Sequence, residues 1–129
     1  MSFSPEKDFH VILSQSLASN NQISFLDISG NRLGLNGAQS LKRGLIANSS
    51  LHEVNLGGNG IGDSGVTEIA EALTVNTSVK SINFELNYIR NEGCSALAQT
   101  LLKFDNLTII DLSWNHIGID GARYFLRIF

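Results

Sequence analysis

The chain has 129 residues, of which 43% are hydrophobic and only 16% are charged. This composition supports one packed domain and is too apolar for a disordered chain. The formal net charge is −3, which disfavours general binding to nucleic acids or to anionic membranes, because their phosphate groups would be repelled.

Residues 1–22 predict a helix that has no partner strand. Ser4 and Pro5 are typical of a helix start, with serine as the cap and proline in the first turn. Leu13 and Leu17 then recur at helical spacing on one apolar face. We therefore expect a helical capping half-repeat at 1–22, which covers one end of the core.

The sequence favours a cytoplasmic protein. Residues 1–15 lack the basic start and apolar core of a secretory signal. The single cysteine, Cys94, cannot form an internal disulfide. No apolar run approaches the roughly 18 residues that a membrane span requires. Three glycosylation sequons, at Asn48, Asn76 and Asn106, would matter only if the chain were secreted.

From residue 23 onward the chain repeats itself with a period of 28. The units 23–50, 51–78, 79–106 and 107–129 align without a gap, as one continuous domain. The first, fourth, sixth and eleventh positions are apolar in every unit. The ninth position is always asparagine and the fifteenth always glycine: Asn31, Asn59, Asn87 and Asn115, with Gly37, Gly65, Gly93 and Gly121.

Each unit predicts a short strand, a loop and a helix. Around positions three to seven, apolar residues alternate with polar ones, so that positions four and six point inward and three, five and seven point outward. The predicted helix caps are Asn36, Ser64, Asn91 and Asp120. One unit buries too little apolar surface to fold alone, so the units must stack. We expect the asparagines to form a structural ladder that satisfies backbone groups of the loops.

This pattern, L-x-x-L-x-L-x-x-N-x-L with a helical second half in each unit, resembles the ribonuclease-inhibitor class of leucine-rich repeat proteins. The resemblance covers residues 23–129. It implies an α/β solenoid shaped as a short right-handed horseshoe, with a parallel β-sheet on the concave face and α-helices on the convex face. Members of this class, such as ribonuclease inhibitor, innate-immune receptor arms and the actin regulator tropomodulin, share a shape and not one partner.

A G-x-G-x-x-G sequence at Gly60, Gly62 and Gly65 raises the alternative of a dinucleotide site. Only the last of these glycines recurs in every unit. Gly60 also comes four residues after Leu56, whereas a dinucleotide site needs its first glycine directly after the strand. We therefore interpret these glycines as a turn and a tight helix entry, and we expect no cofactor.

Nothing in the sequence indicates catalysis. No nucleophile is spaced with a base, and no metal-ligand pattern is present. Asp27 and Asp111 share the fifth position but lie three strands apart, roughly 14 Å. Cys94 falls on a buried helical face. A resemblance to Ran GTPase-activating proteins, built from similar repeats, leaves one enzyme-like regulatory role open through Arg32 or Arg90.

The sequence points instead to a protein-binding surface on the concave face and its rim. The outward strand positions carry four acids and no base, which favours a partner with a basic surface. Aromatic residues and arginine at positions eight and ten are the types that dominate interface energies, although Tyr88 and Trp114 could instead pack on neighbouring loops. The candidate binding residues are Phe25, Asp27, Arg32, Glu53, Glu85, Leu86, Tyr88, Ile109, Asp111, Trp114 and His116.

The last unit supplies a second hypothesis. Its residues Ile109, Ile119, Tyr124 and Ile128 are apolar where earlier units carry polar side chains. Such a surface could pair two copies of the chain, so self-assembly is the alternative to partner binding. The outlined sheet covers only about 300 Å², whereas a standard interface needs about 800 Å² per side, so partner binding must also use the rim loops.

Overall fold

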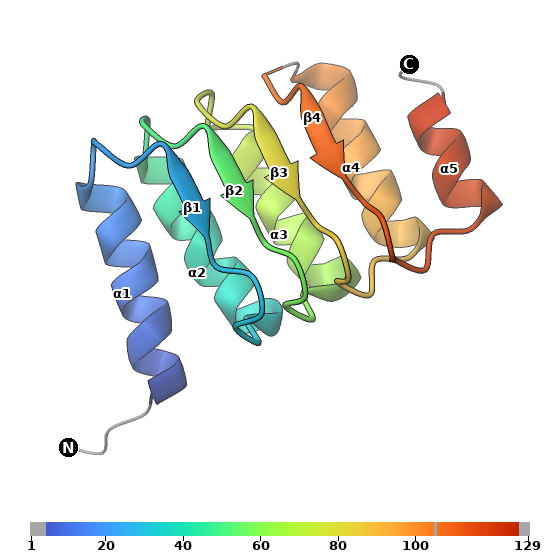
Figure 1. The fold of residues 1–129 in the computed structure, drawn as a ribbon. Helices are drawn as coiled ribbons and strands as arrows, with labels where there is room; N and C mark the ends of the chain where they lie inside the picture. The colour runs from blue at the N-terminus through green and yellow to red at the C-terminus, as the bar shows by residue number, and fades with distance from the viewer. Residues whose placement is uncertain (1–4, 105, 127–129) are drawn as a thin grey trace.

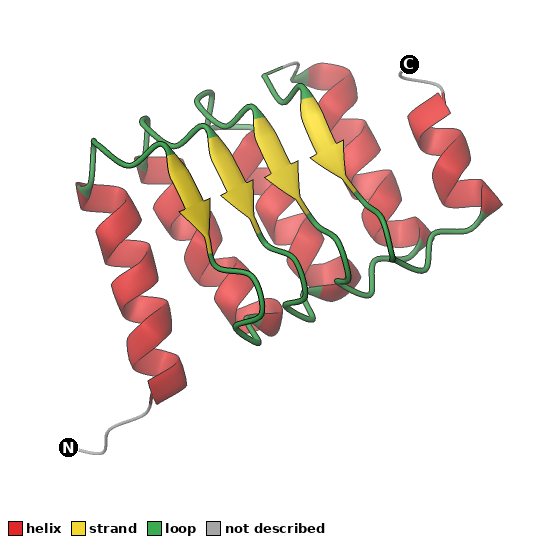
Figure 2. Ribbon diagram, viewed as in Figure 1, coloured by secondary structure: helices red, strands yellow, loops and turns green. Residues whose placement is uncertain are grey.

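The computed structural model of the protein describes residues 5–104 and 106–126; the predicted cap Ser4 and the apolar Ile128 lie outside them. Five helices and four strands alternate along this part of the chain (Figures 1 and 2). The helices are α1 (Pro5–Ser19), α2 (Gly34–Ala47), α3 (Gly62–Leu73), α4 (Asn91–Lys103) and α5 (Ile119–Leu126), and the strands are β1 (Phe25–Asp27), β2 (Glu53–Asn55), β3 (Ser81–Asn83) and β4 (Ile109–Asp111).

The four strands form one parallel sheet in the order β1-β2-β3-β4, and the helices form a second layer behind it (Figure 1). Every strand pairs with the next at an offset of one full repeat, as in Leu26↔Val54 and Val54↔Ile82. The sequence period is therefore the register of the sheet. The expected leucine-rich repeat solenoid, with its sheet and helices in separate layers, is confirmed.

The core lies between the two layers. In the central units the inward positions are closed to solvent: Val54 is 1% exposed, and Leu56 and Phe84 are 0% exposed. At the N-terminal end, α1 packs on α2 and buries Leu13 and Leu17. The boundary at residue 22 between a capping half-repeat and the repeats stays a prediction. None of the helices in the described residues has the length and apolar character that a membrane crossing requires.

The recurrent asparagines join neighbouring repeats. The Asn59 Nδ2 donates to the carbonyl of Leu56 in its own loop and to that of Ile28 one repeat earlier, both at 3.0 Å. The Asn59 Oδ1 accepts the N–H of Asn31 at 2.7 Å. Asn87 and Asn115 repeat this pattern of bonds to the preceding loop. Asn59, Asn87 and Asn115 therefore each tie two loops together, whereas the Asn31 side chain bonds carbonyls of its own loop. Stacking supplies the partners that a single repeat lacks.

The strands are shorter than the alternation predicts, because the fifth residue of each unit ends the strand. Asn55 and Asn83 each accept the backbone N–H two residues later, at 3.0 and 2.7 Å. Asp27 and Asp111 do the same with the N–H groups of Ser29 and Ser113. A side chain that bonds its own backbone in this way makes a turn that competes with the strand.

The four predicted helix caps are wrong. Asn91 is the first residue of α4, after the N-cap residue Arg90. The caps predicted for α2, α3 and α5 are wrong because those helices begin earlier. These helices begin at Gly34, Gly62 and Ile119, so Asn36, Ser64 and Asp120 lie within their first turns. The N-cap residues of α2 and α3, Leu33 and Ile61, make no side-chain cap, whereas α4 and α5 are capped by side chains of the preceding repeat.

Two carboxylate or amide oxygens provide these caps. The Asp63 Oδ1 accepts the N–H groups of Arg90 and Gly93 at the start of α4. The Asn91 Oδ1 accepts those of Gly118 and Gly121 at the start of α5. A cap that satisfies orphan N–H groups of the next helix stabilises the stack as well as the helix.

Candidate functional site

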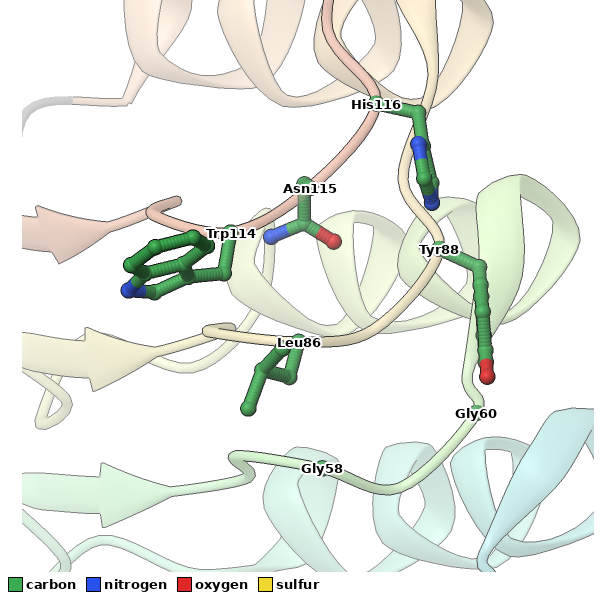
Figure 3. Close-up of a pocket in the computed structure, with 7 residues that line it drawn as sticks. All are labelled: Gly58, Gly60, Leu86, Tyr88, Trp114, Asn115 and His116. Carbon is green, nitrogen blue, oxygen red and sulfur yellow. The ribbon is translucent and has the colours of Figure 1, made fainter.

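A hollow of about 500 Å³ opens on the rim where the carboxyl ends of β2, β3 and β4 continue into loops (Figure 3). Leu86, Tyr88, Trp114 and His116 form its walls. The remaining lining residues are Gly58, Gly60 and the ladder residue Asn115. The hollow therefore belongs to the second, third and fourth repeats together.

The hollow exists because equivalent positions carry very different side chains. Positions eight and ten are glycine in the second repeat, at Gly58 and Gly60, and they are leucine and tyrosine in the third, at Leu86 and Tyr88. Figure 3 shows Leu86 pointing toward Gly58 and Tyr88 pointing toward Gly60. A Cβ atom added to either glycine would meet nothing within 4 Å. The missing side chains of one loop thus leave the space that the large side chains of the next loop border.

The large rim residues occupy a backbone conformation that favours glycine. The φ angles of Leu86, Tyr88 and Trp114 are 57°, 58° and 56°, close to the 66° and 62° of Gly58 and Gly60. The left-handed region costs an L-residue roughly 1–2 kcal/mol, because Cβ approaches the following carbonyl oxygen. Backbone strain of this kind is concentrated at functional sites in proteins, so its presence in large residues suggests a functional role.

These side chains remain in contact with water. Leu86 is 53% exposed, Tyr88 64% and Trp114 78%. The Tyr88 ring stacks on the His116 ring, with centroids 6.0 Å apart and planes inclined by 10°. This stack leaves most of the tyrosine accessible, and Trp114 buries only a small part of its surface against its surroundings. The rim therefore presents an apolar, partly aromatic surface.

Four carboxylates lie along the concave face, one in each repeat, and Glu85 directly precedes Leu86 of the hollow. Asp27, Glu53 and Asp111 are exposed and Glu85 is half-buried. Among the described residues, none of these four carboxylates takes part in a salt bridge. Hydrogen bonds from the Ser29 hydroxyl and then its N–H lower the pKa of Asp27, and Ser113 lowers the pKa of Asp111 in the same way. Both aspartates thus stay ionised while they end their strands.

The structure brings only part of the predicted surface together. Leu86, Tyr88, Trp114 and His116 surround one hollow. Phe25 and Ile109 begin the two outermost strands, at opposite edges of the sheet and away from the rim. Arg32 lies two loops from Tyr88, because the loop of Gly60 separates them.

Gly58, Gly60 and Asn115 line the hollow, although the sequence reasoning did not include them among the binding residues. Gly58 and Gly60 could have been found by comparing positions eight and ten between repeats, because glycine in one unit faces a large residue in the next.

The residues considered for catalysis are dispersed. Within the described part of the chain, no group of three or more His, Cys, Asp or Glu side chains could hold a metal ion. Cys94 is 1% exposed, and burial raises the pKa of its thiol to about 11. A buried neutral thiol is a packing residue, since the thiolate is the nucleophilic form.

Comparisons with known proteins agree with this architecture. A sequence model described as Leucine Rich repeat matches the chain over residues 19–42, 47–70, 75–98 and 106–126. Leiomodin-1 actin-binding site 2 superposes with a TM-score of 0.77 at 17% identity, over 98% of this chain and 72% of that one. The tropomodulin C-terminal domain of Caenorhabditis elegans gives 0.75 at 14% identity, over 97% and 74%. At these identities the likeness concerns the fold alone. A comparison with curated protein sequences gives no match.

Proposed function

Because the chain belongs to the leucine-rich repeat family, we propose that it is a non-catalytic module that binds a protein partner through its concave face and the adjoining rim loops. The observation that carries this proposal is the rim itself. Leu86, Tyr88 and Trp114 are large, exposed and held in a strained backbone conformation. Folding alone favours glycine at these positions, so the side chains have a role outside the fold.

The proposed partner carries a basic surface. The support for this is the row of carboxylates on the concave face. Among the described residues, none of these carboxylates forms a salt bridge. Complementary charge accelerates association and excludes partners of the same sign. We also propose a cytoplasmic location, which the buried thiol of Cys94 supports. Asn48 and Asn76, which match the sequon, are only 5% and 4% exposed, so they are poor glycan acceptors.

Actin is the first defined partner to test, because the leiomodin-1 domain of similar fold is titled an actin-binding site. Co-sedimentation with actin filaments, with a buffer-only control, measures this directly. If the chain stays in the supernatant at every actin concentration, actin filaments are not its partner, and the proposal that it binds another protein is unaffected.

Self-assembly is the second candidate function. Its support is the last repeat, where Ile109 is 63% exposed and Ile119 is 73% exposed. Exposed apolar patches of this kind serve as interaction sites or cause aggregation. Light scattering over a hundredfold range of concentration separates the candidates: a mass that stays that of one chain refutes self-assembly, and a mass that doubles supports it.

Site-specific photo-crosslinking tests the proposed face. A photo-reactive phenylalanine analogue replaces Tyr88 on the rim in one variant, and in a matched variant it replaces Gln99, which is exposed on α4 of the convex layer. We expect a cellular protein to crosslink to the rim variant and not to the helix variant. Equal crosslinking from both positions, or from Gln99 alone, would refute binding through the rim.

A further inference from the structure

Resting on the proposed function, we infer that the rim hollow binds an extended segment of a partner protein, in which one large apolar side chain lies within two residues of a lysine or arginine. The apolar side chain enters the hollow between Leu86, Trp114 and Tyr88, and the cation reaches the carboxylates of Glu85 and Asp111. The hollow and the two carboxylates thus form one composite site.

The dimensions of the hollow suit a side chain and not a whole element. Its volume of about 500 Å³ lies in the range of sites that hold small ligands. It is open to solvent, and large apolar groups border it on two sides. Such a site buries the end of a leucine, methionine or phenylalanine while the peptide backbone stays outside. An aromatic wall that contributes little to folding is typical of the anchor in an interface.

The two carboxylates lie within reach of the same short segment. Glu85 directly precedes Leu86, and Asp111 pairs with Asn83 two residues before Glu85. With ~4.8 Å between strands and ~3.3 Å per residue, the Cα atoms of Glu85 and Asp111 are about 8 Å apart. An extended peptide advances the same distance in two to three residues. One cation adjacent to the apolar anchor therefore contacts either carboxylate.

The charge of this face distinguishes a peptide from a nucleic acid. The stacked Tyr88 and His116 could also accept a base. Glu85 and Asp111 would then face the phosphates of the nucleic acid. Among the described residues, neither carboxylate forms a salt bridge that would neutralise its charge. Repulsion of this kind opposes binding, whereas nucleic-acid sites surround their stacking residues with lysine and arginine. A basic peptide meets no such penalty.

The experiment is a selection of random twelve-residue peptides on the purified chain, followed by affinity measurement with fluorescent copies of the winners. We expect the winners to share a large apolar residue within two positions of a lysine or arginine. Trp114→Gly should weaken their binding roughly 30-fold, as truncation of an aromatic anchor does. Glu85→Lys should weaken it roughly 5-fold and should be rescued by a peptide whose lysine is changed to glutamate. Val75→Ala, which alters an exposed apolar residue outside the hollow, is the control.

Each alternative result would contradict a defined part of this inference. If the affinity of the selected peptides depends on Trp114 but not on Glu85, Asp111 or the salt concentration, the requirement for a basic residue is wrong and the proposed face stands. Winners that bind Trp114→Gly as tightly as the native chain overturn the site. Tight binding of a single-stranded oligonucleotide at Tyr88 overturns the peptide assignment. If no peptide binds at 100-fold excess over the chain, the inference is wrong, and the crosslinking from Tyr88 still decides the proposed function separately.

Discussion

The strain at Trp114 predicts an unusual order of stabilities for two truncations of this residue. Trp114 is 78% exposed, so roughly 50 Å² of its surface is buried, and truncation to alanine should cost about 1 kcal/mol. Alanine keeps the left-handed φ of 56° and hence the strain of roughly 1–2 kcal/mol. Glycine removes the strain but adds about 0.5–1 kcal/mol of backbone entropy cost.

Trp114→Gly should therefore be more stable than Trp114→Ala by about 0.5–1 kcal/mol. The glycine variant should lie close to the native chain. In a domain of this size the difference between the two variants corresponds to roughly 2–5 °C in melting temperature. Urea unfolding followed by circular dichroism measures the free energies of unfolding of the native chain and both variants.

The matched control is Gln99, which is exposed inside α4. In a right-handed helix the order of stabilities reverses, so the free energy of unfolding of Gln99→Ala should exceed that of Gln99→Gly by about 1 kcal/mol. If Trp114→Ala proves as stable as Trp114→Gly or more stable, the left-handed conformation is absent in solution. The inference from strain to function then loses its basis.

Three further outcomes follow from the packing. Asn59→Leu should leave the N–H groups of Asn31 and Leu33 without their acceptor, at about 1–3 kcal/mol each, and a melting curve that matches the native one would contradict the ladder. Asp63→Ala should lose about 1 kcal/mol by uncapping α4, whereas Ser64→Ala should change unfolding little; equal losses would refute capping by the preceding repeat. At pH 8 a maleimide should label Cys94 more than about 100-fold more slowly in the native chain than in urea, because burial raises its pKa to about 11; similar rates would show an accessible thiol.

The repeating pattern alone was sufficient to predict the architecture. Apolar residues at fixed positions in four successive units determine which side of each strand faces the core, and the same period became the register of the sheet. Local chemistry was less reliable. The caps were assigned to Asn36 and Ser64 within each repeat, because the sequence does not reveal that Asp63 reaches the helix of the following repeat.

The candidate site was predictable in residue type and not in extent. Sequence reasoning selected Leu86, Tyr88, Trp114 and His116 by their chemistry and their positions in the repeat, together with Phe25 and Ile109, which lie far from the hollow. Of the two glycines that leave space beside them, Gly60 was interpreted from the sequence as part of a turn, and Gly58 was not considered.

The sequence by itself therefore determined the repeat, the sheet and the inward-facing side chains, because periodic burial of apolar surface is a property of the chain order. Only the tertiary structure decided that three loops form one hollow, that Leu86, Tyr88 and Trp114 are held at positive φ, and that capping groups cross between repeats. The hollow and the caps depend on distances between residues of neighbouring repeats, which the stacking of the repeats sets.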